Sequence, residues 1–189
     1  MGFDDKTIPS ILSKIDKDKL LLIDWKINAA EDNNCVFQDF GKSFLEALKE
    51  GVDLFKKYKE IHFLYPSFTN HPIETVDYFK KFCKEYQFSF KIITNPREFN
   101  IEKNIAYISV SDRMLGMFLE QSRDKKFEPG VDVGFLSYNE TPMKKFIYKG
   151  ITVVSTDFKE LGTKAAEFVM EDKKINYLVP TKLTIRESL

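Results

Sequence analysis

The sequence predicts an α/β fold in which a mainly parallel sheet lies between two layers of helices. Strand-like and helix-like segments alternate about seven times along the chain, the order expected of a parallel sheet with helical crossovers. The run at 19–25, KLLLIDW, is almost continuously apolar, as parallel strands covered on both faces are. Each strand-like run ends in polar residues, so the carboxyl ends of the strands must form a polar rim along one edge.

The elements expected in the first two thirds of the chain follow from hydrophobic spacing. A short helix is expected before the run at 19–25, and a polar, aperiodic loop follows it at 26–34. Apolar residues at three- and four-residue spacing over 37–58 predict a long helix with Gly51 as a weak point. The next expected elements are strands at 61–65, 90–94 and 105–110 and helices at 73–86 and 111–126.

The stretch 131–162 is the one around which the prediction is organised. It indicates a strand at 131–137, a polar turn at 138–141, a short helix opened by Pro142, a strand at 151–155 and a helix from Asp157. Asp157 and Glu160 have the spacing of a capping box at the start of that helix. The buried face of the helix is expected to comprise Phe158, Leu161, Ala165, Phe168 and Val169.

Composition excludes several functional classes. Lys+Arg and Asp+Glu both number 29, so the net charge is near zero, whereas a nucleic-acid surface needs a basic stripe. No apolar run approaches the ~20 residues of a membrane span, and MGFDDKTIPSILSK does not resemble a secretion signal. Cys35 and Cys83 have no CxxC spacing and are expected to be free thiols. We therefore expect a cytoplasmic protein that contacts no membrane.

Motifs of catalysis and cofactor binding are missing from the sequence. No GxGxxG follows a strand and no GxxxxGK[ST] occurs, so these nucleotide-phosphate cradles are absent. His62 lies inside an expected strand and is interpreted as a core or edge residue, whereas His71, in a strand-end loop, either contacts a ligand or is solvated. Acidic strand ends can hold Mg²⁺, but no DxD or Asp-Asp pair supports such a site. We expect no catalytic residue, no metal and no cofactor.

Several segments resemble the sugar-binding domain of lactose-repressor-type (LacI/GalR) transcription regulators. They are VFQDFGKSFLEAL at 36–48, VSDRMLGMFL at 110–119, SYNETP at 137–142, GITVVSTDFKELGTKAAEFV at 150–169 and LTIRESL at 183–189. In this family a strand ends in a Tyr-Asp-Asp or Tyr-Asn-Asp turn, and a later Asp starts a helix with paired Ala. The Gln-Asp-Phe and Ser-Tyr-Asn variants are most similar to gluconate-repressor-type (GntR) winged-helix regulators that carry such a domain.

The resemblance implies the two-lobed fold of type I periplasmic sugar-binding proteins, with most of the chain in the second lobe. The implied parts are the end of the first lobe at 1–25, a crossover at 26–36, the second lobe at 37–156, a helix returning to the first lobe at 157–172 and extended segments of the second lobe at 173–189. The family's DNA-binding head has no counterpart here, so the resemblance implies a fragment. Its uncovered first-lobe faces are expected to pair with another copy or to rearrange.

The expected site lies at or beside positions that contact ligand in the family. These positions are Gln38, Asp39, Ser111, Asp112, Tyr138 and Asn139, with Phe68 and Phe99 as rings that stack on a sugar. Each has a structural alternative: Asn139 forms only its turn, Ser111 only caps a helix, and Asp112 only complements the helix dipole. For the rings, Tyr138 included, the alternative is core packing. The family's ligand-binding Arg, expected near 74–75, has no counterpart.

Taken together, the resemblance implies the effector-binding, dimerising domain of a bacterial transcription regulator. A small sugar would bridge the lobes and favour their closed form, and this shift would act on DNA through a head missing from this chain. No bond is made or broken, so the chain is not expected to be an enzyme. The alternatives are a sugar-binding protein of a transport system, which the missing secretion signal disfavours, and an enzyme on a flavodoxin-like sheet.

Overall fold

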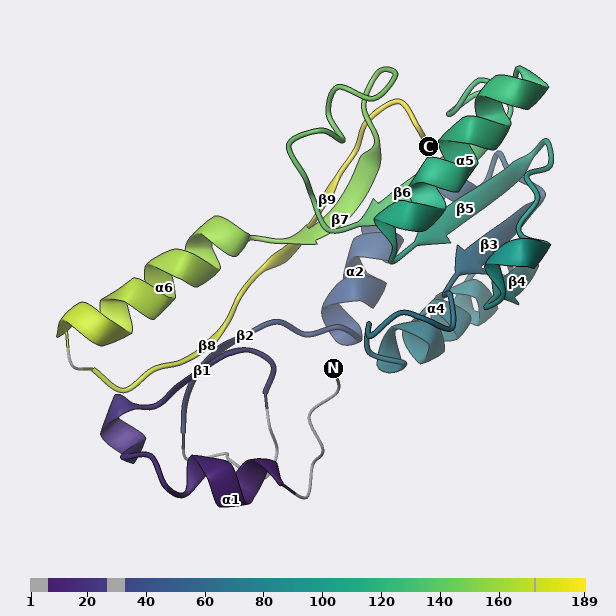
Figure 1. Ribbon diagram of the computed structural model, residues 1–189. Coiled ribbons are helices and arrows are strands. Elements are labelled where there is room, and N and C mark those ends of the chain that lie inside the picture. Colours follow the sequence, from purple (N-terminus) through teal and green to yellow (C-terminus); the bar gives the residue numbers. More distant parts are fainter. Residues whose placement is uncertain (1–6, 27–32, 172) are drawn as a thin grey trace. The chain divides into compact units, whose positions relative to one another are not determined.

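The computed structural model describes residues 7–26, 33–171 and 173–189, which form two compact units (Figure 1). Unit 1 comprises the residues up to 39 together with 156–181, and unit 2 comprises 40–155 together with 182–189. The chain therefore passes between the units three times. Both units contain parallel strands and helices, which confirms the predicted α/β class.

Unit 1 holds a three-stranded parallel sheet in the order β1-β2-β8. Its strands are β1 (Leu21–Asp24), β2 (Asn34–Phe37) and β8 (Asn176–Leu178), and its helices are α1 (Ile8–Leu12) and α6 (Phe158–Glu171). The Asn34 side chain joins three segments, because its Nδ2 donates to the Lys17 carbonyl at 3.1 Å and its Oδ1 accepts from the Ile175 amide at 2.9 Å. A buried amide that uses both ends in this way fixes the register of these segments.

The apolar faces of unit 1 are more exposed than the sequence predicts. The run at 19–25 predicts a strand covered on both faces, but Ile23 is 49% and Trp25 48% exposed, so this prediction is wrong. In α6 Phe168 is buried as predicted, whereas Phe158 and Val169 are exposed. β1 is an edge strand of a small sheet, and α6 packs on β1 and β2 with only part of its predicted face. An apolar run shows that a strand favours cover, but not what supplies it.

Unit 2 is built on a six-stranded sheet in the order β4-β3-β5-β6-β7-β9. Its strands are β3 (Glu60–Leu64), β4 (Phe90–Ile93), β5 (Ile105–Ser109), β6 (Gly134–Tyr138), β7 (Thr152–Thr156) and β9 (Thr181–Thr184). The pairs from β4 through to β7 are parallel, so the carboxyl ends of β3, β5 and β6 lie at the same edge of the sheet. This edge is where the polar rim is predicted.

Helices cover both faces of this sheet, which confirms the predicted three-layer arrangement (Figure 1). The helices are α2 (Lys42–Glu50), α3 (Val52–Phe55), α4 (Glu74–Glu85) and α5 (Asp112–Lys125). Successive strand residues point to opposite faces, so Phe63 packs in the core under α2 and α4 while Leu64 packs in the core under α5. Gly51 separates α2 from α3, as its position predicts.

Two boundaries in the organising stretch differ from the prediction. Strand β6 begins at Gly134 rather than Val131, because Gly130, with a φ of 83°, turns the chain and its amide donates to the Val133 carbonyl at 2.7 Å. Pro142 opens no helix, and the segment up to Gly150 folds as successive turns. The turn at its start is closed by the Lys144 amide, which donates to the Thr141 carbonyl at 3.0 Å.

The predicted crossover at 26–36 is described only in part. Residues 27–32 lie outside the described ranges, and its last residues belong to β2. Cys35 on β2 and Cys83 on α4 are both free and buried, as predicted, and burial raises the pKa of the Cys83 thiol to about 12. In the part of the chain that the structure describes, every helix is too short or too polar to span a bilayer.

Candidate functional site

The candidate site lies where β5 and β6 end at the carboxyl edge of the unit 2 sheet. These strands are neighbours, with Ser109 paired to Ser137, so the residues that follow them are brought to one place. Ser111 precedes α5 as its N-cap residue, but its hydroxyl makes no capping bond. The Ser109 hydroxyl instead accepts from the Ser111 amide and donates to the Ser111 carbonyl, both at 3.1 Å. The Ser111 side chain is therefore not used for the cap, the alternative that the sequence left open.

Asn139 forms the turn after β6 in a left-handed conformation. Its φ is 63°, and its amide donates to the Val154 carbonyl of β7 at 2.7 Å. Its Oδ1 is buried and accepts no hydrogen bond from any described residue. A buried acceptor without a partner costs about 1–3 kcal/mol, so a donor from outside the chain would stabilise it. Asn139 therefore forms the turn, and its side-chain oxygen is left available, so its assignment as a ligand contact stays a prediction.

A buried lysine connects Asn139 with Asp112. The Lys144 Nζ donates to the Asn139 carbonyl at 2.7 Å, to Asp112 Oδ1 at 2.7 Å and to the Tyr138 carbonyl at 3.4 Å. Four of the predicted site residues, Ser111, Asp112, Tyr138 and Asn139, thus share one edge, and three of them contact the same ammonium group. Sequence reasoning missed Lys144, because nothing in the pair Lys144–Lys145 indicates which lysine is buried.

The ring of His71, in the loop after β3, packs against aromatic rings beside this edge. The His71 ring lies 4.6 Å from the Tyr138 ring and 5.4 Å from the Phe40 ring, both edge to face. The Thr75 hydroxyl donates its one proton to the Phe40 carbonyl at 3.1 Å, so the His71 Nε2 at 2.8 Å must be the donor to Thr75. Burial lowers the pKa of His71 to about 4, because a desolvated imidazolium is disfavoured. His71 is therefore a neutral packed residue rather than a solvated one.

We expect low pH to destabilise the fold through protonation of His71. The folded pKa of His71 is about 4 and its unfolded pKa about 6.5, so protons bind the unfolded state first. The contribution of neutral His71 to the free energy of unfolding is complete above about pH 6.5. Up to about 3 kcal/mol of this contribution is lost as the pH falls towards 4. We expect His71→Phe to lose less stability than the parent between pH 7 and 4.5 in urea unfolding. Parallel curves for the two proteins would contradict this pKa.

The other predicted residues are placed differently. Phe99 is 4% exposed and packs edge to face on Tyr107, so the geometry favours core packing for it. Phe68 is 47% exposed, and the Arg113 guanidinium from the first turn of α5 lies 5.1 Å above its ring. Phe68 is therefore the predicted stacking ring that keeps accessible surface, with one face taken by Arg113.

Gln38 and Asp39 belong to unit 1, whereas the edge just described belongs to unit 2. The Gln38 amide donates to the Asp24 carboxylate and accepts from the Thr156 hydroxyl at 2.7 Å. The Thr156 hydroxyl also lies 3.3 Å from that of Thr181, so one chain of hydrogen bonds links residues next to all three crossings. The Gln38 side chain is 6% exposed, and both ends of its amide are used within unit 1.

The closing Arg-Glu-Ser motif stabilises this part of the sheet. The Arg186 guanidinium pairs with Glu140 and donates to the Ile151 carbonyl at 2.7 Å. The Ser188 hydroxyl donates to the Phe135 carbonyl at 2.7 Å and accepts from the Thr152 amide at 2.7 Å. Arg186 thereby holds the residue next to Asn139 without belonging to the edge itself. Within the described ranges, no three His, Cys, Asp or Glu side chains are grouped as metal ligands.

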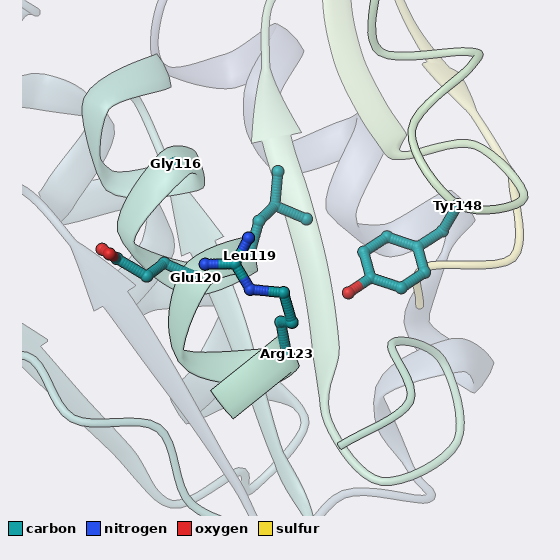
Figure 2. Close-up of a pocket in the computed structure, with 5 residues that line it drawn as sticks. All are labelled: Gly116, Leu119, Glu120, Arg123 and Tyr148. Atoms are coloured by element: carbon teal, nitrogen blue, oxygen red, sulfur yellow. The ribbon is translucent and has the colours of Figure 1, made fainter. Parts of the chain in front are cut away.

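A separate hollow of about 400 Å³ lies between α5 and the segment 142–150 (Figure 2). Its lining residues are Gly116, Leu119, Glu120, Arg123 and Tyr148. Figure 2 shows Leu119 extending from α5 towards the Tyr148 ring, whereas the Arg123 guanidinium turns away from that ring. Tyr148 is 53% exposed and has a φ of 50°, a conformation that costs a non-glycine residue about 1–2 kcal/mol. Met143 and Phe146 of the same segment are also exposed.

Comparison with known proteins places this fold among repressor structures. Neither the family models nor the sequences of curated proteins give a match. The Escherichia coli transcriptional repressor AscG superposes with a TM-score of 0.78 at 13% identity, over 98% of this chain and 74% of that one. A transcription regulator-like protein from Staphylococcus haemolyticus superposes with a TM-score of 0.72 at 16% identity, over 98% of this chain and 72% of that one. The lac repressor dimer bound to operator and an anti-inducer superposes with a TM-score of 0.74 at 15% identity, over 98% of this chain and 61% of that one.

These superpositions agree with the fold implied by the sequence motifs. They span nearly the whole chain and include both parallel sheets, although the sequences have diverged far. The similarity to gluconate-repressor-type regulators stays a prediction. The chain has the α/β fold of LacI/GalR-type repressor structures.

Proposed function

We propose that this chain is the ligand-sensing part of a bacterial transcription regulator and that its ligand is a small sugar. The observation that carries the proposal is the buried, unpaired Oδ1 of Asn139 at the carboxyl edge of a parallel sheet. Ligands of open α/β folds bind outside the carboxyl ends of the strands. The transcription regulators and repressors among the similar structures support a sensing role over a catalytic one.

The chemistry of this edge suits a polyhydroxylated ligand. A sugar hydroxyl both donates and accepts, and the Asn139 amide offers an acceptor in Oδ1 and a donor in Nδ2. The Ser111 hydroxyl, which does not cap α5, can serve a second sugar hydroxyl. The exposed part of the Phe68 ring provides an apolar surface for sugar C–H groups. Asp39 and Gln38 stay candidate contacts on the strength of the resemblance alone.

The regulatory mechanism follows from the family that the sequence resembles. Sugar binding in a cleft between two lobes would favour the closed form, and the ligand can shift this equilibrium only by its differential affinity for the two forms. DNA binding would reside in a separate head, as in the family that the sequence resembles. The lac repressor described as bound to operator and anti-inducer supports this division of roles.

Calorimetry with a panel of sugars tests this proposal. The full chain would be titrated with L-arabinose, D-xylose, D-glucose, D-galactose, L-fucose and L-rhamnose. We expect at least one sugar to bind without being consumed. Chemical turnover of a bound sugar would indicate an enzyme instead, and silence across the whole panel would contradict a sugar ligand.

We also propose that unit 2 pairs with a second copy through α5 and the segment 142–150. Phe146 is 74% and Met143 67% exposed, and both belong to the segment 142–150, which also carries Tyr148 of the hollow. Exposed apolar surface of this kind is stabilised by burial at about 25 cal/mol per Å². A two-fold axis would place the same patch on both sides of the interface. The similar lac repressor structure that is described as a dimer supports a second copy of the chain as the partner.

A charge introduced into the proposed interface, formed by α5 and the segment 142–150, should weaken self-association. We expect Phe146→Asp to raise the dimer dissociation constant at least tenfold, because its carboxylate would be desolvated in the interface. Sedimentation equilibrium over a range of concentrations measures the effect. Ile73→Asp is the matched control, since Ile73 is 64% exposed outside this interface and should not alter the constant. A parent chain that stays monomeric throughout would contradict the proposal.

A further inference from the structure

Lys144 is the one Lys, Arg, Asp or Glu residue in the buried class among the residues that the structure describes. Its side chain is 2% exposed, and it forms an ion pair with Asp112. A buried ammonium group is costly unless its protons are all used in hydrogen bonds. We infer that Lys144 is a positioning residue, which holds Asn139 in the orientation that the proposed ligand site requires.

The contacts of Lys144 use the whole donor capacity of its ammonium group. The Nζ carries three protons and has three acceptors, the carbonyls of Tyr138 and Asn139 and the carboxylate of Asp112. Tyr138 is the last residue of β6, Asn139 begins the turn after it, and Asp112 lies in the first turn of α5. The ammonium therefore joins the two elements that present the candidate site.

The backbone of Lys144 is itself fixed on both sides. Its amide donates to the Thr141 carbonyl at 3.0 Å, and its carbonyl accepts from the Ile151 amide at 2.8 Å. Ile151 directly precedes β7, so the side chain extends inwards from an anchored point. The turns that stand after Pro142 in place of the predicted helix bring the Lys144 ammonium group to the Asn139 carbonyl.

The consequence for the site is a restrained Asn139. Its carbonyl is held by Lys144 and its amide by Val154, so both peptide groups around its Cα are fixed while its Oδ1 is left without a partner. A preorganised acceptor loses less conformational freedom when a ligand binds. Without the ammonium, the left-handed conformation at φ 63° would rest on one fewer contact. This consequence depends on the proposed function, whereas the positioning itself does not.

Lys144→Met tests the inference because methionine retains the length of the side chain and removes the charge and its donors. In the ligand-free ¹⁵N-labelled chain, we expect this change to shift or broaden the backbone and side-chain amide signals of Asn139. Lys144→Arg should restore them in part, and Lys145→Met, at the exposed neighbour, should leave them in place. The same Lys144→Met change should weaken binding of the sugar selected from the panel at least tenfold.

A second variant guards against a Lys144→Met protein that does not fold. Asp112→Asn alters an exposed side chain and removes the anionic partner of Lys144, so a smaller shift of the Asn139 signals is expected. Unchanged Asn139 signals in folded Lys144→Met, or in Asp112→Asn where the first variant is unfolded, would overturn the inference. If no sugar binds the parent chain, the proposed function fails, and the Asn139 signals still decide whether Lys144 positions this turn.

Discussion

Asn139→Gly is expected to weaken sugar binding about a hundredfold. The change removes the side-chain amide, and two hydrogen bonds to sugar hydroxyls are together worth about 2–3 kcal/mol. Glycine adopts the left-handed conformation of Asn139 without strain, so the turn after β6 should persist. Calorimetric titration with the sugar that binds most tightly measures the loss of affinity.

Asn104→Gly is the matched control for this prediction. Asn104 has the same φ of 63° and precedes β5 at the amino end of the strands, away from the candidate edge. Both variants therefore replace a left-handed asparagine in a turn, and only one removes an amide from the proposed site. Equal affinities of the two variants for the sugar would show that Asn139 is not a ligand contact.

Gly130→Ala is expected to lower the free energy of unfolding of unit 2 by about 3 kcal/mol or more. A Cβ at this position would lie 1.8 Å from the Glu187 carbonyl oxygen, and the φ of 83° disfavours any side chain. The clash would push the closing segment away from the sheet, where Ser188 pairs with Phe135. Urea unfolding followed by circular dichroism measures this loss.

Gly162→Ala is the comparison, and it is expected to raise the free energy of unfolding. Gly162 lies in α6, and a Cβ there would meet no atom within 4 Å. Alanine has the higher helix propensity, so a gain of about 0.5–1 kcal/mol is expected. Equal effects of the two substitutions would mean that the tight approach at Gly130 does not restrain the fold.

The sequence was sufficient to predict the layers of the fold but not the order of its strands. Alternation of apolar runs and helical spacing identified the parallel sheet and the break at Gly51. That Ser111 and Asn139 lie together depends on β5 and β6 being neighbours, and no local pattern encodes this pairing. The motif resemblance brought them together instead, because it placed both residues at ligand positions.

The residues that the sequence did not identify act through long-range contacts. Thr75 lies on α4, where helical spacing assigns it no role, yet its hydroxyl contacts both Phe40 and His71. Lys144 is indistinguishable in sequence from its exposed neighbour Lys145. Burial of a polar group depends on which acceptors the fold brings to it, so it can be seen only once the strands are assembled.

The most direct test is to map where a sugar binds. ¹H–¹⁵N correlation spectra of the full chain would be recorded while L-arabinose, D-galactose and L-fucose are added in turn. The largest shifts should occur at Ser111, Asn139 and Phe68, around the carboxyl ends of β3, β5 and β6. Shifts concentrated at the amino ends of these strands, near Asn104 and Gly134, would contradict a sugar site at the edge that Asn139 and Lys144 form.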